Sequence, residues 1–480
     1  MPQQSETNRW LVLVLVCLAQ FMVVLDATIT NVALPSIQQD LDFSQGSLQW
    51  VINSYTLVFG GFLLLGGRAG DLFGRKRIFL AGVVIFTVAS LANGLSQSGE
   101  MLIACRALQG LGAALVSPAA LSIITTTFAE GEDRAKALGV WSAIAAGGAA
   151  FGLLLGGILT DLLSWEWIFF VNVPIGIAAF LLSLRYVPES VAPERPDTVD
   201  LPGAISVTAG LMVLVFALVK AQDYGWGSAR TLGLGAVAVA LLAAFVLIES
   251  RSKAPLIRLG IFRSRNISGS NAVMLLVIGG MYAFFFLVSL YVQQVLGYSP
   301  LEAGLAFLPF TLGIIVGAGV SQPIARRIPV HFIALIGIGL AILGLVILRG
   351  AGVDGTYLGN LLPGIIPMSI GMGMTFLPLT LVATTGVSNS DAGLASGLFN
   401  TSQQVGGALG LAILAAVANS RTDSVVEAGS SLPVALTEGF QTALMVGSAF
   451  AVLGAVLALL LVDGREVEEN VDGDLVPVTT

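Results

Sequence analysis

Charged residues are scarce in this chain of 480 residues: they make up 11% of the sequence, against about 25% in soluble domains. Hydrophobic residues make up 56%, and the mean hydropathy is +0.90. This balance excludes an ordinary soluble domain and predicts an all-α integral membrane protein with many spans.

Cysteine and histidine are also scarce. Cys17 and Cys105 both fall within apolar runs, so a disulfide framework is not expected. His331 is the single histidine, which argues against a histidine-based metal site. The sequence has no phosphate-binding loop that would use ATP and no nucleophile, base and metal set that would make an enzyme. We expect no cofactor, no metal and no nucleic-acid partner.

Fourteen apolar runs are long enough to span a bilayer, at 10–33, 48–68, 78–96, 101–125, 137–162, 167–185, 202–220, 231–249, 269–292, 302–322, 331–349, 358–383, 400–419 and 440–462. If the N-terminus is cytoplasmic, 17 Lys and Arg residues lie inside and four outside, as the positive-inside rule requires. We expect a multi-pass protein of the plasma (bacterial inner) membrane with both termini cytoplasmic.

The sequence repeats itself at an offset of eight runs. GGAAFG at 147–152 is matched by GGALG at 406–410. We expect an N-terminal six-helix bundle over 1–200, an inserted helix pair over 201–250, a C-terminal six-helix bundle over 251–463 and an acidic cytoplasmic tail over 464–480. Parallel repeats of this kind indicate a transporter with a central site, although small-residue packing alone also explains the glycine matches.

Asp26 follows sixteen uncharged residues that begin at Trp10. A carboxylate inside a bilayer costs at least about 2.5–3.5 kcal/mol. Counting about 1.5 Å per residue places Asp26 and Arg106 at the same depth, about 8 Å from the outer face. We predict that Asp26 couples transport to protons and that Arg106 tunes it. A static ion pair between the two helices is the alternative.

The loop after the second run reads GRAGDLFGRKR. Gly67 is expected to allow close helix approach, and Gly74 a tight turn. Asp71 is expected either at a helix N-terminus or paired with a basic side chain. Arg75 and Lys76 are expected to face the anionic inner leaflet. A positive-inside clamp explains the basic residues but not the spacing of the others.

The fifth run carries glycines at four-residue spacing, namely Gly148, Gly152 and Gly156, followed by Gly157. Such a stripe allows a partner backbone to approach closely. The alternative to a role in conformational change is that these glycines serve helix packing alone. Several amides and aromatics are candidates for lining a substrate cavity, although packing explains many of them equally well: Asn31, Asn53, Tyr55, Gln109, Trp141, Tyr282, Phe285 and Gln403.

These motifs resemble the major facilitator superfamily and, more narrowly, its fourteen-helix drug:proton antiporters of the second such family. GRAGDLFGRKR resembles the loop 2–3 motif, LDATITNVALP the first-helix motif, RALQGLG the fourth-helix motif and WEWIFFVNVPIG the segment before helix six. The resemblance extends from about residue 10 to 463. It implies that Asp26 is the membrane-embedded acid and that Arg106 takes part in proton transfer.

Two positions depart from that family. Leu153 replaces a proline of the fifth-helix motif that helps bend the helix and limit proton leak, so strict antiport stays open. Glu166 replaces an arginine between two tryptophans. Runs nine to fourteen carry no acid at mid-membrane depth, which favours neutral, monocationic or amphiphilic cargo.

The sequence therefore favours a proton-coupled exporter of small hydrophobic or amphiphilic molecules, such as drugs, dyes or antibiotics, working by alternating access. The alternative is a dedicated exporter or flippase of an endogenous lipid, siderophore or antibiotic. A receptor or scaffold that transports nothing is a third class. We expect the partners to be the substrate, protons and membrane lipid, and the protein to be a monomer.

Overall fold

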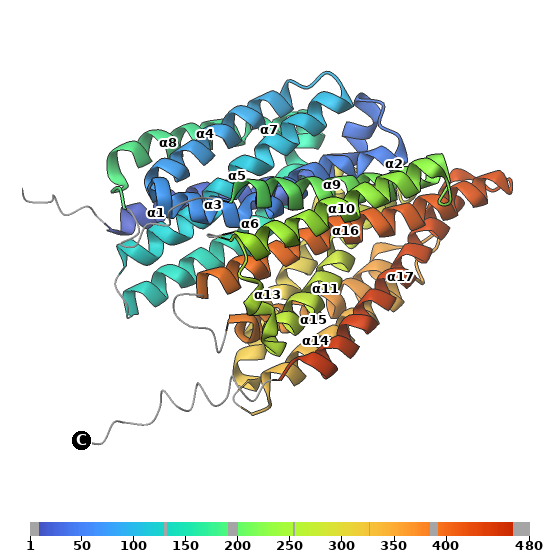
Figure 1. Ribbon diagram of the computed structural model, residues 1–480. Coiled ribbons are helices and arrows are strands. Elements are labelled where there is room, and N and C mark those ends of the chain that lie inside the picture. The colour runs from blue at the N-terminus through green and yellow to red at the C-terminus, as the bar shows by residue number, and fades with distance from the viewer. Residues whose placement is uncertain are drawn as a thin grey trace, which may run out of the picture. The chain divides into compact units, whose positions relative to one another are not determined.

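The computed structural model describes residues 9–128, 132–190, 200–252, 255–325, 327–384 and 392–463. Every regular element in these ranges is a helix (Figure 1). Contacts divide the chain into two compact units, one formed by Met1–Leu256 with Tyr298–Leu305 and the other by Ile257–Gly297 with Ala306–Thr480.

The first unit holds α1 (Arg9–Asp40), α2 (Gln45–Leu48), α3 (Trp50–Phe73), α4 (Arg75–Gly94), α5 (Gly99–Thr127), α6 (Glu132–Leu162), α7 (Trp167–Phe170), α8 (Asn172–Tyr186), α9 (Leu201–Tyr224), α10 (Ala229–Arg251) and all but the last residue of α12 (Pro300–Ala306). The second holds η1 (Leu259–Arg263), α11 (Arg265–Leu290), η2 (Tyr291–Val295), α13 (Leu308–Ile324), α14 (Val330–Leu348), η3 (Tyr357–Leu361), α15 (Leu362–Thr384), α16 (Ala392–Glu427) and α17 (Leu432–Leu461).

Polar caps mark where several of these helices begin. The Ser98 side chain accepts from the Met101 N–H at the start of α5, and Asp200 accepts from the Gly203 N–H at 2.8 Å at the start of α9. Such a cap satisfies a backbone donor that the helix itself leaves open. Within each helix the backbone satisfies its own hydrogen bonds, which is the condition for crossing lipid.

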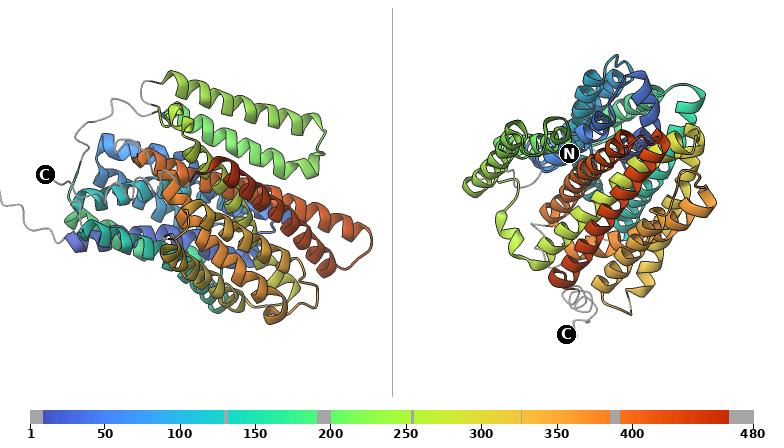
Figure 2. Two further views of the ribbon diagram at one scale, coloured as in Figure 1. Left: turned by 90° about the horizontal axis from the view of Figure 1, so that it is seen from below. Right: turned by 90° about the vertical axis from the view of Figure 1, so that its right-hand side faces the viewer.

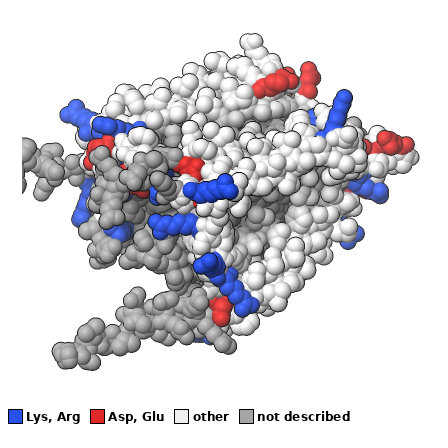
Figure 3. All heavy atoms as spheres, in the orientation of Figure 1, with Lys and Arg blue, Asp and Glu red and all other residues white. Residues whose placement is uncertain are grey.

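Thirteen of the described helices are long and apolar enough to cross a membrane. The expected span 137–162 falls on α6, for which the apolar stretch found among the described residues is Phe151–Leu162. The count of fourteen therefore stays a prediction. Large hydrophobic side chains such as Leu232 and Leu459 are exposed, and charges are sparse on the face seen in Figure 3. This surface suits contact with lipid chains, as in a multi-pass membrane protein.

The helices expected as an insertion pack within the first unit. Helices α9 and α10 lie side by side, as Figure 2 shows. Helix α9 also packs on α3, where a Cβ built on Gly61 would lie 2.0 Å from Thr208 Oγ1. The hairpin of α9 and α10 is therefore packed directly against α3, at a position where only glycine fits, and is not held by its loops alone.

The same helix pairs pack in both units. Helix α6 packs on α1 in the first unit and α16 on α11 in the second, and each pair meets at glycines. A Cβ on Gly156 would lie 2.7 Å from the Ile29 carbonyl oxygen, and one on Gly410 would lie 2.1 Å from Gly279 Cα. Helices α4 and α5 likewise pack together as α14 and α15 do. This pairing matches the repeat seen in the sequence.

The close approach expected at Gly67 lies instead at Gly66. A Cβ on Gly66 would come within 2.0 Å of the Ala114 carbonyl oxygen on α5. A Cβ on Gly67 would lie 3.6 Å from Pro118 Cβ, which is an ordinary contact. Successive residues on a helix point about 100° apart, because a turn holds about 3.6 residues. The packing glycine is therefore one residue earlier than the motif suggested.

These adjacent glycines provide a matched test of the packing. Gly66→Ala should destabilise the protein by about 1–3 kcal/mol, because the new methyl meets backbone that must move. Gly67→Ala has room for its methyl and should be neutral or stabilise the helix by up to about 1 kcal/mol. Thermal unfolding of both variants in detergent measures the difference, and equal melting temperatures would contradict this packing.

Candidate functional site

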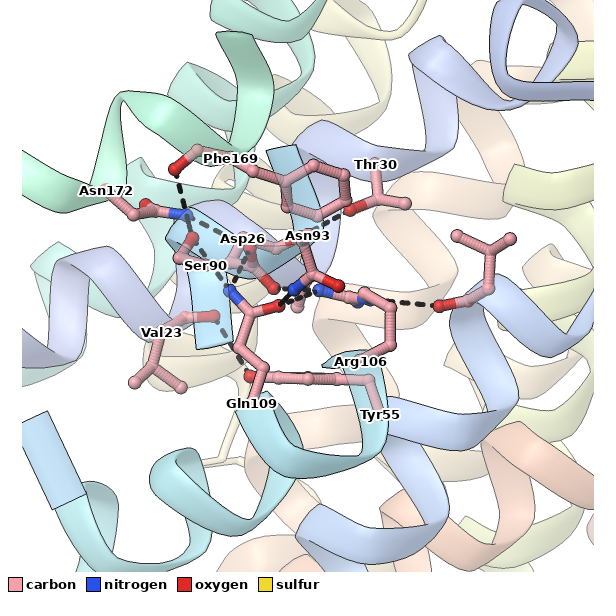
Figure 4. Close-up of polar contacts among 12 residues, drawn as sticks. Val23, Asp26, Thr30, Tyr55, Ser90, Asn93, Arg106, Gln109, Phe169 and Asn172 are labelled. Atoms are coloured by element: carbon pink, nitrogen blue, oxygen red, sulfur yellow. Dashed lines mark hydrogen bonds and ion pairs between the residues drawn. The ribbon is translucent and has the colours of Figure 1, made fainter. Parts of the chain in front are cut away.

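The carboxyl group of Asp26 is completely buried on α1 and accepts hydrogen bonds from three side chains (Figure 4). Arg106 Nη1 on α5 donates to Oδ2. Gln109 Nε2 donates to Oδ1 at 2.7 Å, and Asn172 Nδ2 on α8 donates to the same oxygen at 3.0 Å. All three donors are N–H groups, and an ionised carboxylate can accept from all of them.

Arg106 is held from several sides while it pairs with Asp26. Its side chain is 1% exposed, and Nε donates to the Val51 carbonyl oxygen at 3.0 Å. Its Cζ lies 4.4 Å from the ring centroid of Tyr55 and 5.6 Å from that of Phe169, which is cation–π distance. Because a guanidinium stays protonated, Arg106 supplies a permanent positive charge at this depth.

Polar side chains of α4 extend the network behind the carboxyl. Asn93 Nδ2 donates to Gln109 Oε1 at 2.7 Å. Ser90 Oγ accepts from Gln109 Nε2 and from Asn172 Nδ2, both at 3.1 Å, and donates to the Phe169 carbonyl oxygen at 3.0 Å. The network therefore joins α4, α5, α7 and α8 to the acid on α1.

Three members of this network were not predicted from the sequence, namely Ser90, Asn93 and Asn172. Each is 0% exposed. The available signal was a polar residue within an apolar run, the same signal that singled out Asp26. Gln109 was predicted to line a substrate cavity, but the structure places it inside the network.

The glycine stripe of α6 faces the helix that carries Asp26. A Cβ on Gly148 would lie 3.3 Å from Phe21 Cδ2, and one on Gly152 would lie 2.1 Å from Thr28 Oγ1. With the contact of Gly156 at Ile29, the stripe follows α1 past the acid. Movement of α6 against α1 would therefore disturb the surroundings of the carboxyl.

Gly157 and Leu153 lie where α6 meets α12. A Cβ on Gly157 would be 2.6 Å from the Pro300 carbonyl oxygen, and one on Gly304 would be 2.6 Å from the Leu153 carbonyl oxygen. Helix α6 is uninterrupted from Glu132 to Leu162. Because Leu153 has the N–H that proline lacks, the sequence gives α6 no proline kink at this point.

The loop motif makes the sharp turn between α3 and α4. Gly74 has φ +103°, a backbone conformation that residues other than glycine rarely adopt. Asp71 lies in the last turn of α3, where its Oδ1 accepts from Arg75 Nη2 at 3.2 Å. Of the two placements considered for Asp71, the structure has the one with a basic partner.

The N-terminus of α4 is bound to the segment after α8. Glu189 Oε1 accepts from the Lys76 N–H at 3.1 Å, and its Oε2 lies 3.7 Å from Arg77 Nε. Lys76 Nζ donates to the Leu184 carbonyl oxygen at 2.8 Å. A carboxylate here complements the positive end of the α4 dipole. Glu189 was not predicted, because its partner Lys76 lies 113 positions away in the chain.

The other lining candidates of the first unit have varied surroundings. Asn31 Nδ2 donates to the Ala27 carbonyl oxygen of its own helix at 3.2 Å. Asn53 is 0% exposed, and no hydrogen bond from a described residue reaches its amide. Tyr55 donates to the Val23 carbonyl oxygen at 3.4 Å, and Trp141 packs on the hydrophobic core. Of these four residues, Tyr55 is the one whose ring contacts the Arg106 guanidinium.

The candidates of the second unit are neutral. Tyr282 on α11 donates to Gln404 Oε1 at 2.9 Å, and Gln403 is the half-buried neighbour of Gln404 on α16. The ring centroid of Phe285 lies 4.8 Å from that of Phe310. The second unit thus offers amides, a phenol and aromatic rings at the predicted positions.

Comparison with known proteins identifies the family. The chain matches the family described as Major Facilitator Superfamily over residues 16–411. The chain belongs to this superfamily.

Two relatives and a solved structure extend the match. This major facilitator protein is 41% identical to the puromycin resistance protein pur8 of Streptomyces alboniger, over 96% of this chain and 93% of that protein. It is 43% identical to the cephamycin export protein CmcT of Amycolatopsis lactamdurans, over 85% of each. The POT family transporter PepTSo shares the fold, with TM-score 0.70 and 17% identity over 97% of this chain and 99% of that one. The superfamily expected from the sequence motifs is confirmed, and its members are transporters.

The buried pair should control the stability of this major facilitator protein. Arg106→Leu leaves the Asp26 carboxylate buried without its charge partner and should cost about 3–5 kcal/mol. Adding Asp26→Asn removes that charge and should restore part of the loss. Thermal unfolding of the two single variants and the double variant gives the coupling. A double variant no more stable than Arg106→Leu would show that the pair is not the source of the loss.

The contact of Glu189 with α4 should protect the basic loop. Glu189→Ala removes the acceptor for Lys76 N–H and the partner of Arg77, so trypsin should cleave at residues 75–77 several-fold faster in the purified protein. Glu438→Ala is the matched control, because it removes a similarly exposed ion pair, to Arg421 in the second unit. Cleavage at the wild-type rate in Glu189→Ala would contradict the contact.

Proposed function

We propose that this protein exports small hydrophobic or amphiphilic molecules across the cytoplasmic membrane by alternating access, driven by protons that bind Asp26. The observation that carries the proposal is a completely buried carboxyl that contacts a permanent cation and two amides. A buried charge of this kind within spanning helices indicates a coupling site. Each proton that moves inward yields about 2.3 kcal/mol per 100 mV of membrane potential.

The two protonation states of Asp26 would differ most at Arg106. When Asp26 binds a proton from the outer side, the attraction between the two side chains falls. Arg106 would keep the Gln109 Oε1 acceptor, at 2.7 Å, and the Val51 carbonyl oxygen. The cation therefore stays hydrogen-bonded while its pairing with α1 weakens, which would favour a rearrangement of α1 against α5.

Movement of α1 would reach the rest of the first unit through two contacts. The glycine stripe of α6 follows α1 on both sides of the acid. The loop motif, with Asp71, Arg75 and Lys76, would stabilise the state in which Glu189 contacts α4. How tightly proton and cargo are tied depends on α6, in which Leu153 replaces the family's proline.

Cargo recognition falls to neutral groups in this proposal. Tyr282, Gln403 and Phe285 of the second unit and Asn31, Asn53 and Trp141 of the first would supply hydrogen bonds and aromatic contact. Such groups suit neutral, monocationic or amphiphilic molecules. We further propose that the protein is a monomer in contact with membrane lipid and that both of its termini are cytoplasmic. Its helices would form two six-helix bundles with an inserted helical hairpin.

A dedicated antibiotic exporter is the second candidate. It is favoured by the relatives, since pur8 is named for puromycin resistance and CmcT for cephamycin export. Gradient-driven transport of a compound panel in proteoliposomes separates the candidates: activity confined to one chemical class supports the dedicated exporter, and activity across dyes and unrelated drugs supports the broad one.

Asp26→Asn should abolish gradient-driven transport while leaving the protein folded, because the amide has nearly the shape of the carboxyl but cannot carry the proton. Substrate binding should survive. Asp161→Asn is the control, since it neutralises an exposed acid at the end of α6. The measurement is substrate accumulation in proteoliposomes under an imposed pH difference. Wild-type accumulation by Asp26→Asn would refute the proton role of this residue.

A further inference from the structure

We propose that Asn172 is the positioning residue that senses the protonation state of Asp26, by reversing its side-chain amide when the proton binds. This proposal rests on the proton role proposed for Asp26. It follows from a difference between the two amides that contact the carboxyl. One is fixed at both ends, and the other is engaged at one end only.

The Gln109 amide is fixed in orientation. Its Oε1 accepts from Arg106 Nη1 and from Asn93 Nδ2, both at 2.7 Å, while its Nε2 donates to Asp26. Reversal would bring its NH₂ group against two other donors. Gln109 can therefore present only an N–H to Asp26.

The Asn172 amide is engaged only through its nitrogen. Nδ2 donates to Asp26 Oδ1 at 3.0 Å and to Ser90 Oγ at 3.1 Å. Its Oδ1 is buried and accepts no hydrogen bond from a described residue. The side chain thus holds an unused acceptor within one bond rotation of the acid.

A protonated carboxyl needs an acceptor for its new O–H. Arg106 has none to offer, and the Gln109 oxygen is engaged elsewhere. Of the three side chains that hydrogen-bond to Asp26 here, Asn172 alone can supply an acceptor. An O–H left buried without an acceptor costs about 1–3 kcal/mol.

Reversal of Asn172 supplies that acceptor. It places Oδ1 where Nδ2 now lies, 3.0 Å from Asp26 Oδ1, so the carboxyl O–H can donate to it. Oδ1 is the unpaired end of the amide before reversal, and the NH₂ group takes its place afterwards. The exchange therefore satisfies the new O–H.

Ser90 extends the change to the neighbouring helices. It now accepts from Asn172 and donates to the Phe169 carbonyl oxygen at 3.0 Å. After reversal, the Asn172 oxygen is a second acceptor within reach of the Ser90 hydroxyl. The proton on α1 would then weaken the hydrogen bond between α4 and α7.

The groups around Asp26 that bear charge or titrate are few among the described residues. Helix α5 contributes Arg106, and α3 contributes Tyr55, which lies against the guanidinium. Helices α4 and α8 contribute the neutral Ser90, Asn93 and Asn172. Helix α6 contributes glycines to its contact with α1. The amide reversal is thus driven by the charge of Asp26 itself.

Infrared difference spectroscopy of the full-length protein in lipid, recorded against pH, tests the proposal. The carbonyl stretch of protonated Asp26 is the band that Asp26→Asn removes. In Asn172→Leu this band should move to higher wavenumber, because the O–H has lost its acceptor. Ser183→Ala, on the same helix and equally buried, should leave it in place.

Transport against pH gives the second readout. Asn172→Leu should slow gradient-driven transport about tenfold. The pH midpoint of transport should stay nearly unchanged, because the hydrogen bond of Asn172 is lost from both protonation states of Asp26. A fixed donor would predict a midpoint displaced to higher pH, because its loss would destabilise the ionised carboxylate more than the protonated carboxyl. That displacement, or an infrared band that does not move in Asn172→Leu, would overturn the proposal and leave the proton role of Asp26 intact.

Two further outcomes are informative. If Asn172→Leu does not fold, Asn172→Ser takes its place, because its shorter hydroxyl side chain does not reach Asp26 as the amide does. If the wild-type protein shows no band that depends on Asp26, the proton role itself fails and the role of Asn172 fails with it.

Discussion

The ion pair between Asp26 and Arg106 is the interaction on which the first unit depends. Both side chains are buried, and a buried charge is tolerated only with a partner and further hydrogen bonds. The acid lies on α1, and its partners come from α5 and α8, with α4 behind them. Packing alone would leave these helices free to slide a little. The charge fixes their depth and rotation, since an offset along the helix would leave a donor or acceptor unpaired.

Small residues make this arrangement possible, because charged groups can meet only where backbones come close. Gly110 faces the backbone of Tyr55, where a Cβ would lie 2.4 Å from the carbonyl oxygen, one turn from Arg106. On the other side, α6 presents glycines to α1. The acid is therefore enclosed by helices that touch through backbone, which excludes water and lipid from the pair. Away from water the interaction between the two charges is strong, so neutralising Asp26 with a proton changes the energy of the pair by more than it would at the surface.

The sequence predicted the charged pair but not the network residues Ser90, Asn93 and Asn172, and the reason is physical. A carboxylate in an apolar run is costly enough to be conspicuous, and counting residues along two helices gives its depth. Whether Asn172 or Ser90 faces that carboxylate depends on the rotation of each helix, which composition does not specify. The displacement of the packing glycine from Gly67 to Gly66 has the same origin. Glu189 escaped prediction because its contact joins distant parts of the chain.

The two units divide the chemistry between them. The first carries the buried ion pair of Asp26 and Arg106, whereas the predicted lining residues of the second are neutral, such as Tyr282 and Gln403. An acid that must change its protonation state is best kept away from cargo that could itself pair with it. In the proposed function, a neutral lining would select cargo by shape and hydrogen bonding, and the proton energy would enter through helix movement rather than direct competition. How tightly proton movement is coupled to cargo transport would then depend on the contact between α6 and α1, because the glycine stripe and the acid lie on these facing helices.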